Sequence, residues 1–136
     1  PYLQGQFRQA IPHYEQAITL ERAHSTLGKA VWRLLVHNLG VAYGMTGDLA
    51  RAKTTLDYGL SRDPANSLFH YHLARIYAGM NDRVKAMQSL HAAFRNDRQR
   101  EADDRIPDPR QDVSFRRFML DSAFRKLADS LMQPAI

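Results

Sequence analysis

Two stretches of this 136-residue chain decide its fold: LGVAYGMTGDLARAKTTLDYGL at residues 39–60 and LARIYAGMNDRVKAMQSLHAAF at residues 73–94. They align at an offset of 34 residues, and a weaker copy of their second half occurs 42 residues upstream of the first stretch. A fixed offset of this size indicates a repeat architecture. The paired positions are Leu39 and Leu73, Tyr43 and Tyr77, Gly47 and Asn81, Asp48 and Asp82, Ala52 and Ala86, and Leu56 and Leu90.

Each copy predicts two helices joined by a tight turn. Apolar residues recur at steps of three and four on both sides of the turn, which places them on one face of each helix. At the turn stand Gly47, Asn81 and, in the upstream copy, Gly5; glycine and then asparagine best tolerate the left-handed backbone that ends a helix. Asp48 and Asp82 follow at once, and aspartate is a good N-cap for the next helix.

The helix pattern can be written as residue ranges. An eight-residue surplus between the first two copies falls at 19–31 and predicts a break near 24–26. The helix after that break is expected to be lengthened and to carry Trp32, which we interpret as a packing residue. No strand is expected in residues 30–96. The predicted helices are 7–22, 28–45, 48–61, 66–79 and 82–96, followed by one or two tail helices after residue 112.

The repeated residues resemble a known family. Leu39-Gly40-x-x-Tyr43, Ala52, Leu56, Gly59 and Pro64 are similar to the tetratricopeptide repeat, whose period is 34 residues. The resemblance implies an all-α, right-handed superhelical stack of antiparallel helical hairpins. It divides residues 1–100 into a truncated repeat (1–24), a repeat with an extended first helix (25–66) and a further repeat (67–100). Residues 101–136 then form a linker and capping helices, similar to the segment that closes many bacterial arrays. The alternative is that the aromatic residues of this tail form a docking or dimerisation surface.

Composition argues against an enzyme or a cofactor protein. The chain has no cysteine, and its six histidines show no pairing at helical metal spacing. It has no HExxH motif, no glycine-rich phosphate loop and no nucleophile elbow. No stretch approaches the ~20 apolar residues of a membrane span. The compartment stays open, with the cytoplasm favoured over the periplasm.

Charge also argues against a nucleic-acid partner. The net charge is +5, but residues 1–66 hold seven basic and five acidic residues, and most basic clusters have acids beside them. A phosphate-binding surface would concentrate its charge on one face. We therefore expect a protein or peptide partner, and binding through the arginine-rich second half is the weaker alternative.

The resemblance also implies where a partner binds. In tetratricopeptide stacks the first helix of each hairpin lines a concave groove. The repeat frame places six candidate residues there, and we expect them to accept an extended or helical segment with an acidic or carboxamide-bearing side chain near an apolar one. Two alternatives stay open: these side chains pack against a helix or the tail, or the chain is a structural segment of a longer solenoid. The candidates are His37, Asn38, Val41, Tyr71, His72 and Arg75.

A last expectation concerns the first predicted helix. Since the first copy has only its second helix, the apolar face of that helix should be under-covered, and exposed apolar patches promote association. We therefore expect homo-oligomers to form through this end, or this end to be disordered. The residues of that face are Phe7, Ile11, Tyr14 and Ile18.

Overall fold

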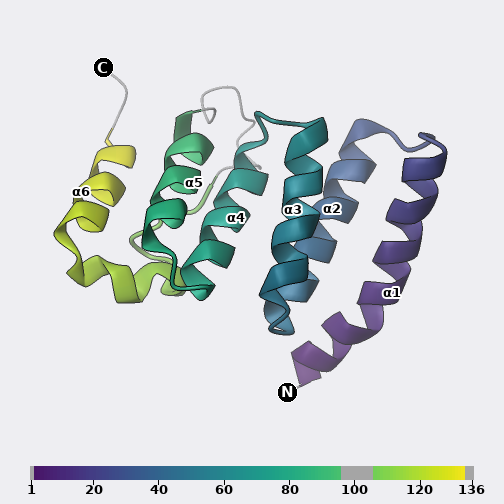
Figure 1. Ribbon diagram of the computed structural model, residues 1–136, viewed down its shortest axis with the longest axis horizontal. Helices are drawn as coiled ribbons and strands as arrows, with labels where there is room; N and C mark the ends of the chain where they lie inside the picture. Colours follow the sequence, from purple (N-terminus) through teal and green to yellow (C-terminus); the bar gives the residue numbers. More distant parts are fainter. Residues whose placement is uncertain (1, 96–105, 134–136) are drawn as a thin grey trace. The chain divides into compact units, whose positions relative to one another are not determined.

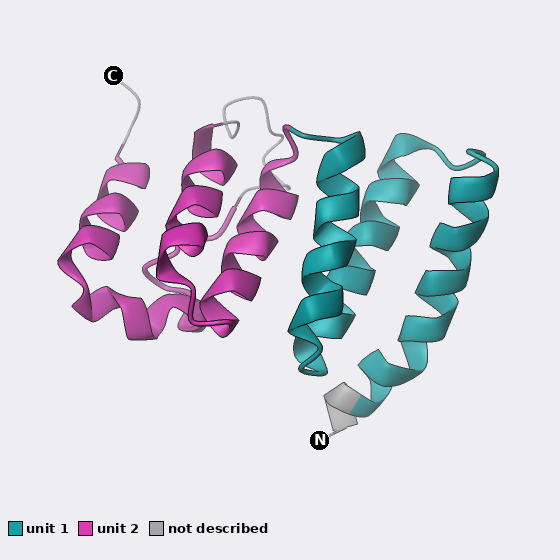
Figure 2. Cartoon of the chain, viewed as in Figure 1, with its two compact units in different colours: residues 1–64 teal, residues 65–136 magenta. Residues whose placement is uncertain are grey.

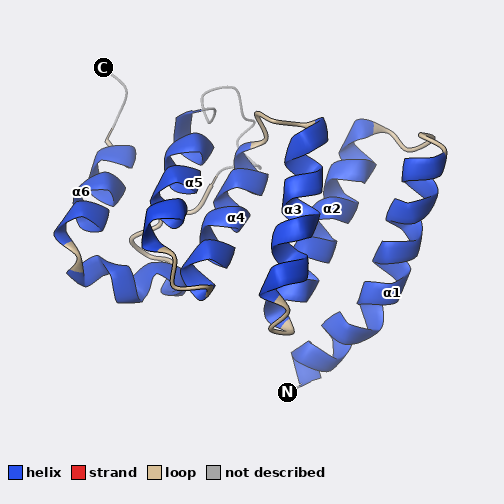
Figure 3. Ribbon diagram, viewed as in Figure 1, coloured by secondary structure: helices blue, strands red, loops and turns tan. Residues whose placement is uncertain are grey.

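The computed structural model describes residues 2–95 and 106–133, and every regular element in those residues is helical (Figure 1). The linker predicted from residue 101 lies partly outside the described residues. Figure 3 shows helices joined by loops, with no strand in the described part of the chain. The elements are α1 (Tyr2–Ala23), α2 (Lys29–Met45), α3 (Leu49–Arg62), α4 (Ser67–Gly79), α5 (Arg83–Arg95), the 3-10 helix η3 (Val113–Leu120) and α6 (Ser122–Leu131).

The helical pattern read from the sequence is confirmed for α2 to α5, whose ends fall within one residue of the predicted ones. The start of α1 was predicted wrongly. That helix begins at Tyr2, so Gly5 lies inside it and not at a turn. The reason is that glycine permits a turn without requiring one, and a helix interior tolerates it at a cost of about 1 kcal/mol.

The chain divides into two compact units, residues 1–64 and 65–136 (Figure 2). In the first unit α2 packs against both α1 and α3. α2 and α3 approach each other closely at Gly40, where an added Cβ would lie 3.2 Å from Leu56 Cδ2. α2 is linked to α1 by the Tyr43 hydroxyl, which donates a hydrogen bond to the Glu15 carboxylate.

The insertion between α1 and α2 is a short loop, as predicted. Glu21 is only 2% exposed, and its carboxylate accepts hydrogen bonds from the backbone N–H groups of Thr26 and Leu27, at 3.1 and 3.0 Å. Trp32 follows the loop and is 4% exposed. Its Nε1 donates to the Tyr58 hydroxyl at 3.1 Å, which confirms that Trp32 is a packing residue.

The apolar stripe of α1 is better covered than the sequence suggested. Ile18 is buried, and Phe7, Ile11 and Tyr14 are half-buried, because α1 packs along α2. The expectation of an under-covered face is therefore wrong for Ile18. Among the side chains of α1 that the structure describes, Leu20 is a large apolar one that stays exposed, at 61%. Association through this end stays a prediction.

Both interhelical turns have the geometry that their residues predict. Gly47 has φ +87° and Asn81 has φ 59°. In each turn the next N–H reaches back five residues, Asp48 to the Tyr43 carbonyl and Asp82 to the Tyr77 carbonyl, both at 2.9 Å. This is the Schellman pattern, which satisfies carbonyls at a helix end. Each aspartate then accepts a backbone N–H three residues on, at 3.1 Å, and so caps the following helix.

Gly47→Val is expected to destabilise the chain by about 1–2 kcal/mol. No atom lies within 4 Å of the position of an added Cβ, so the cost comes from the positive φ alone. The control is Gly5→Ala, a helical site that is equally open and should gain up to about 1 kcal/mol. Urea unfolding followed by circular dichroism measures both. Equal stability of Gly47→Val and wild type would contradict the strain assigned to this turn.

The second unit contains the α4–α5 hairpin and the tail. The 3-10 helix η3 packs on α4, and α6 packs on α5. Tail and hairpin share one core, in which Phe115 and Phe124 are completely buried. The hairpin contributes aromatic and small residues to that core, and the tail contributes most of the large apolar ones. The members are Tyr71, Ala74, Ala78, Ala86, Leu90, Ala93, Ile106, Phe115, Phe118, Phe124 and Ala128.

Candidate functional site

The six predicted partner-binding residues divide equally between the two units. His37, Asn38 and Val41 lie on α2 in the first unit, and Tyr71, His72 and Arg75 lie on α4 in the second. Each helix is the first of its hairpin, as the repeat frame requires. The two groups have different surroundings, so they are described separately.

On α4, the tail of the chain already occupies the predicted site. The Tyr71 hydroxyl donates to the Asp112 carboxylate at 2.6 Å. Arg75 Nε donates to Ser114 Oγ at 3.1 Å and lies 3.5 Å from the Asp112 carboxylate. The ring of Phe115 packs edge-on against Tyr71, with 5.9 Å between centroids. An acidic and an apolar side chain therefore bind here, but both come from the same chain.

This packing corrects the sequence-based interpretation of Tyr71. The side chain is 1% exposed, so it belongs to the core and presents no surface to a partner in this structure. His72 and Arg75 stay half-buried. The sequence pattern missed Asp112 and Ser114 because they lie about 40 residues further along the chain. One sequence feature could have pointed to these two residues, their Asp-x-Ser spacing, which is typical of a helix cap. In the structure Asp112 caps η3 by accepting a hydrogen bond from the Ser114 N–H at 2.9 Å.

The electrostatics of this contact favour a charged Asp112 and a neutral Tyr71. Burial, followed by the hydrogen bond to Asp112, raises the pKa of Tyr71, so the phenol keeps its proton and donates. Burial alone would raise the pKa of Asp112. Hydrogen bonds from Tyr71 and from the Ser114 backbone, with the charge of Arg75, nevertheless hold that pKa below its ordinary value.

Acidification is expected to weaken the packing of the tail on α4. Because the pKa of Asp112 is depressed in the folded chain, the charged carboxylate stabilises that chain. This stabilisation is complete above the unfolded pKa of about 3.9. That stabilisation is lost as the pH falls through the folded pKa. The comparison is with Asp112→Asn, which keeps an acceptor oxygen but does not titrate. Urea unfolding at several pH values measures the free energy of unfolding of wild type and of Asp112→Asn. The difference between the two should be constant above about pH 5 and shrink below about pH 4. A difference independent of pH would contradict this assignment.

On α2, the predicted residues belong to a longer apolar stripe. Leu34 is 58% exposed, and His37, Asn38 and Val41 are half-buried. The repeat frame also places Leu34 and Met45 on this face, although the six candidates do not include them, and Val31 is the residue that the frame missed. Val31 is 50% and Met45 43% exposed. We call Val31, Leu34, Asn38, Val41 and Met45 the α2 stripe.

The α2 stripe lies on the side of the helix away from its core. At 100° per residue its five positions fall within about 80° of one another. Val36, which is fully buried, is on the opposite side. No residue from 34 to 47 is charged, so α2 is uncharged on both faces from Leu34 to its end and mostly apolar there. A helix that is apolar all round is normally covered on all sides.

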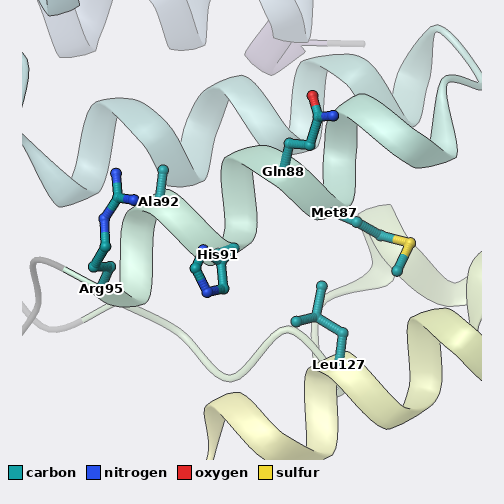
Figure 4. A pocket seen from close by; sticks show the side chains of 6 residues that line it. All are labelled: Met87, Gln88, His91, Ala92, Arg95 and Leu127. Atoms are coloured by element: carbon teal, nitrogen blue, oxygen red, sulfur yellow. The ribbon is translucent and has the colours of Figure 1, made fainter.

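A third candidate is an open cleft of about 400 Å³ between α5 and α6 (Figure 4). His91 and Arg95 stand one helical turn apart on its rim, with Leu127 of α6 facing them. The described lining contains no acidic or nucleophilic side chain, so the cleft offers no acid–base pair. Its residues are Met87, Gln88, His91, Ala92, Arg95 and Leu127.

Two further site types were tested on the described residues. Within residues 2–95 and 106–133, no group of three or more histidine, aspartate or glutamate side chains could hold a metal ion. No helix in the same part of the chain is long and apolar enough to cross a membrane. Asp103 and Asp104, which the sequence places in the linker, lie outside the described residues.

Comparison with known proteins identifies the repeat. A family model described as tetratricopeptide repeat matches residues 45–104. No curated protein and no solved structure matches the chain. Repeats of this family generally mediate protein–protein interactions and are typically non-catalytic. The match begins at the turn after α2 and includes α3, α4 and α5. The paired helices and their Schellman turns agree with this match, which identifies residues 45–104 as tetratricopeptide repeat sequence.

Proposed function

We propose that the chain is a non-catalytic interaction scaffold that binds a segment of a partner protein on the α2 stripe. The observation that carries this proposal is the exposure of Leu34 and Val31 on a helix with no charged residue from 34 to 47. Exposed apolar surface of this kind on a folded chain marks an interaction site.

The α4 face supports the choice of α2. Its aromatic and cationic residues, Tyr71 and Arg75, are engaged by Asp112, Ser114 and Phe115 of the tail. A partner would have to displace a completely buried phenylalanine before reaching them. Of the six residues first predicted, His37, Asn38 and Val41 therefore remain as the partner-binding group, extended by the rest of the α2 stripe.

Leu34→Glu is expected to weaken partner binding about 30-fold, the effect of losing a central apolar anchor. The matched control is Val84→Glu on α5, where the side chain is 55% exposed against 58% for Leu34. Both variants should fold, which circular dichroism checks. Wild type and both variants are immobilised and exposed to an extract of the source cells. The most strongly retained protein is then purified and titrated calorimetrically against all three.

The variant comparison decides between the open interpretations. A partner that Leu34→Glu loses and Val84→Glu keeps supports binding on the α2 stripe. A partner that all three chains retain equally places the site elsewhere. If wild type retains nothing beyond what Leu34→Glu retains, the chain is better described as a structural segment of a solenoid.

A further inference from the structure

Two arginines stack on a pair of aromatic rings at one end of the first unit. The end of α1, the start of α2 and the end of α3 lie at this end, beside the insertion loop (Figure 1). Trp32 of α2 packs edge-on against Tyr58 of α3. The Arg22 guanidinium of α1 lies 4.8 Å from the centroid of the Tyr58 ring. The Arg62 guanidinium of α3 lies 4.8 Å from the centroid of the Trp32 ring, so a cation covers each ring.

Both guanidinium groups contact the same tyrosine. Besides its contact with the indole, Arg62 donates from Nη1 to the Tyr58 hydroxyl at 3.0 Å. Stacking uses the flat face of a guanidinium, while its N–H donors lie in the plane of the group. Since Arg22 and Arg62 are both exposed, these donors can reach a ligand in solvent. The shared contact with Tyr58 also holds two positive charges close together, where they repel each other.

The carboxylates nearest to these arginines in the sequence are engaged elsewhere. Glu21 is buried and accepts hydrogen bonds from two backbone N–H groups of the insertion loop. Asp57 pairs with a lysine one turn earlier in α3, and Asp63 pairs with an arginine of α2, both at 2.7 Å. In the part of the chain that the structure describes, no ion pair joins Arg22 or Arg62 to a carboxylate. Two cations without a counter-ion attract an anion from solution.

The second hairpin lacks this cluster. The 34-residue offset aligns Trp32 with Asn66 and Tyr58 with Ala92, so neither ring has an aromatic equivalent there. Arg22 itself lies in the stretch where the first two copies differ by eight residues. The helical hairpin forms without the cluster in the second unit, so the repeat fold does not require it.

We propose that Arg22 and Arg62 form a binding site for a phosphate monoester, the group found on a phosphorylated side chain or a small phosphorylated compound. Such a group carries a charge of about −1.5 to −2 at pH 7, which two guanidinium groups match. Each guanidinium can also bind two phosphate oxygens with parallel N–H donors. A carboxylate or a phosphodiester carries a single charge and leaves one of the two cations unmatched. This site is additional to the α2 stripe and does not rest on the proposed function.

The test uses Trp32 as a built-in reporter. Trp32 is the sole tryptophan and lies against Arg62, so its fluorescence should change when an anion binds. The full chain is titrated at constant ionic strength with inorganic phosphate and with a short tryptophan-free peptide that carries one phosphoserine. The unphosphorylated peptide, sodium chloride and a single-stranded oligonucleotide serve as comparison probes. A second measurement, the rise of the urea midpoint with phosphate, does not depend on tryptophan emission when followed by circular dichroism.

Three variants locate the site. Arg22→Gln and Arg62→Gln each remove one guanidinium and should weaken binding of the phosphopeptide about tenfold, the effect of losing a charge-assisted hydrogen bond. The matched control is Arg51→Gln, at the other end of α3, whose side chain is 70% exposed. It makes the same change in net charge and should leave the affinity within about twofold of wild type. Circular dichroism checks that all three fold.

The pH dependence tests for a doubly charged ligand. The second pKa of a phosphate monoester is about 6, so binding of the phosphopeptide should be at least about threefold weaker at pH 5 than at pH 7.5. Added protons make the protein itself more positive, which alone would strengthen the binding of an anion. A weakening on acidification therefore comes from the ligand.

Several results would overturn the proposal. They are the absence of a saturable response to both phosphate probes, an equal loss of affinity in Arg51→Gln and Arg22→Gln, or tighter binding at pH 5. An oligonucleotide that binds more tightly than the phosphopeptide, and depends on Arg22, would instead identify a nucleic-acid contact. If the site exists, the two phosphate probes distinguish the source of its ligand. A phosphopeptide that binds at least about tenfold more tightly than inorganic phosphate indicates a phosphorylated protein, and equal affinities indicate a small phosphorylated compound.

Discussion

Phe115→Ala is expected to destabilise the unit formed by residues 65–136 by about 3–5 kcal/mol, the range for truncating a buried phenylalanine. Phe115 is completely buried and joins the tail to α4. Its ring lies 5.9 Å from Tyr71 and 5.7 Å from Phe124, measured between centroids. Truncation would leave a cavity at the point where α4, η3 and α6 meet.

Urea unfolding followed by circular dichroism measures the effect of Phe115→Ala. Leu120→Ala is the control, because Leu120 lies at the end of the same 3-10 helix and is 91% exposed. Its stability should stay within about 0.5 kcal/mol of wild type. If Phe115→Ala were as mild as Leu120→Ala, the tail would not be part of the core. The predicted site at Tyr71 and Arg75 would then be open to a partner.

Trp32→Ala is expected to destabilise the unit formed by residues 1–64, also by about 3–5 kcal/mol. Besides its burial, the indole packs edge-on against Tyr58, with 6.0 Å between centroids. The Arg62 guanidinium lies 4.8 Å above the indole ring. These contacts link the start of α2 to the end of α3. Removing the indole also takes away one of the two donors to the Tyr58 hydroxyl, the other being the Arg62 guanidinium at 3.0 Å.

Trp32→Phe separates the contributions of Trp32. It retains most of the ring packing but removes the Nε1–H that donates to Tyr58, so it should cost clearly less than Trp32→Ala. Circular dichroism follows both variants. Since Trp32 is the sole tryptophan, its fluorescence in wild type reports unfolding of residues 1–64. A small effect of Trp32→Ala, together with loss of partner binding, would contradict the packing role and make this side chain a ligand anchor.

Much of the fold could be predicted because its signals are local. Helix ends depend on residues within a turn of them, and Gly47, Asp48, Asn81 and Asp82 occupy two such turns. The 34-residue offset also places equivalent residues at the same positions of both hairpins, so the helix ends predicted for one hairpin could be compared with those predicted for the other. The misplaced start of α1 shows the limit of this approach, since Gly5 fits a helix interior as well as a turn.

The candidate site was predictable only in part. Periodicity identified which residues of α2 and α4 face away from their hairpin cores, but it could not show what covers them. Val41 and Arg75 occupy equivalent positions, yet Arg75 is engaged by Ser114 of the tail. The contact between Arg75 and Ser114 joins residues that are 39 positions apart in the sequence. Helical spacing cannot predict such a contact, because the contact depends on where the tail packs.

The sequence by itself determined that this chain forms helical hairpins of the tetratricopeptide kind, since turn chemistry and apolar spacing are properties of neighbouring residues. Only the tertiary structure decided which face stays exposed. The tail aromatics Phe115 and Phe124 bury their surface against α4 and α5, and that packing takes Tyr71 into the core. On α2, Val31, Leu34 and Met45 remain exposed. The physical reason is that burial is a property of whole surfaces brought together, which no single segment encodes.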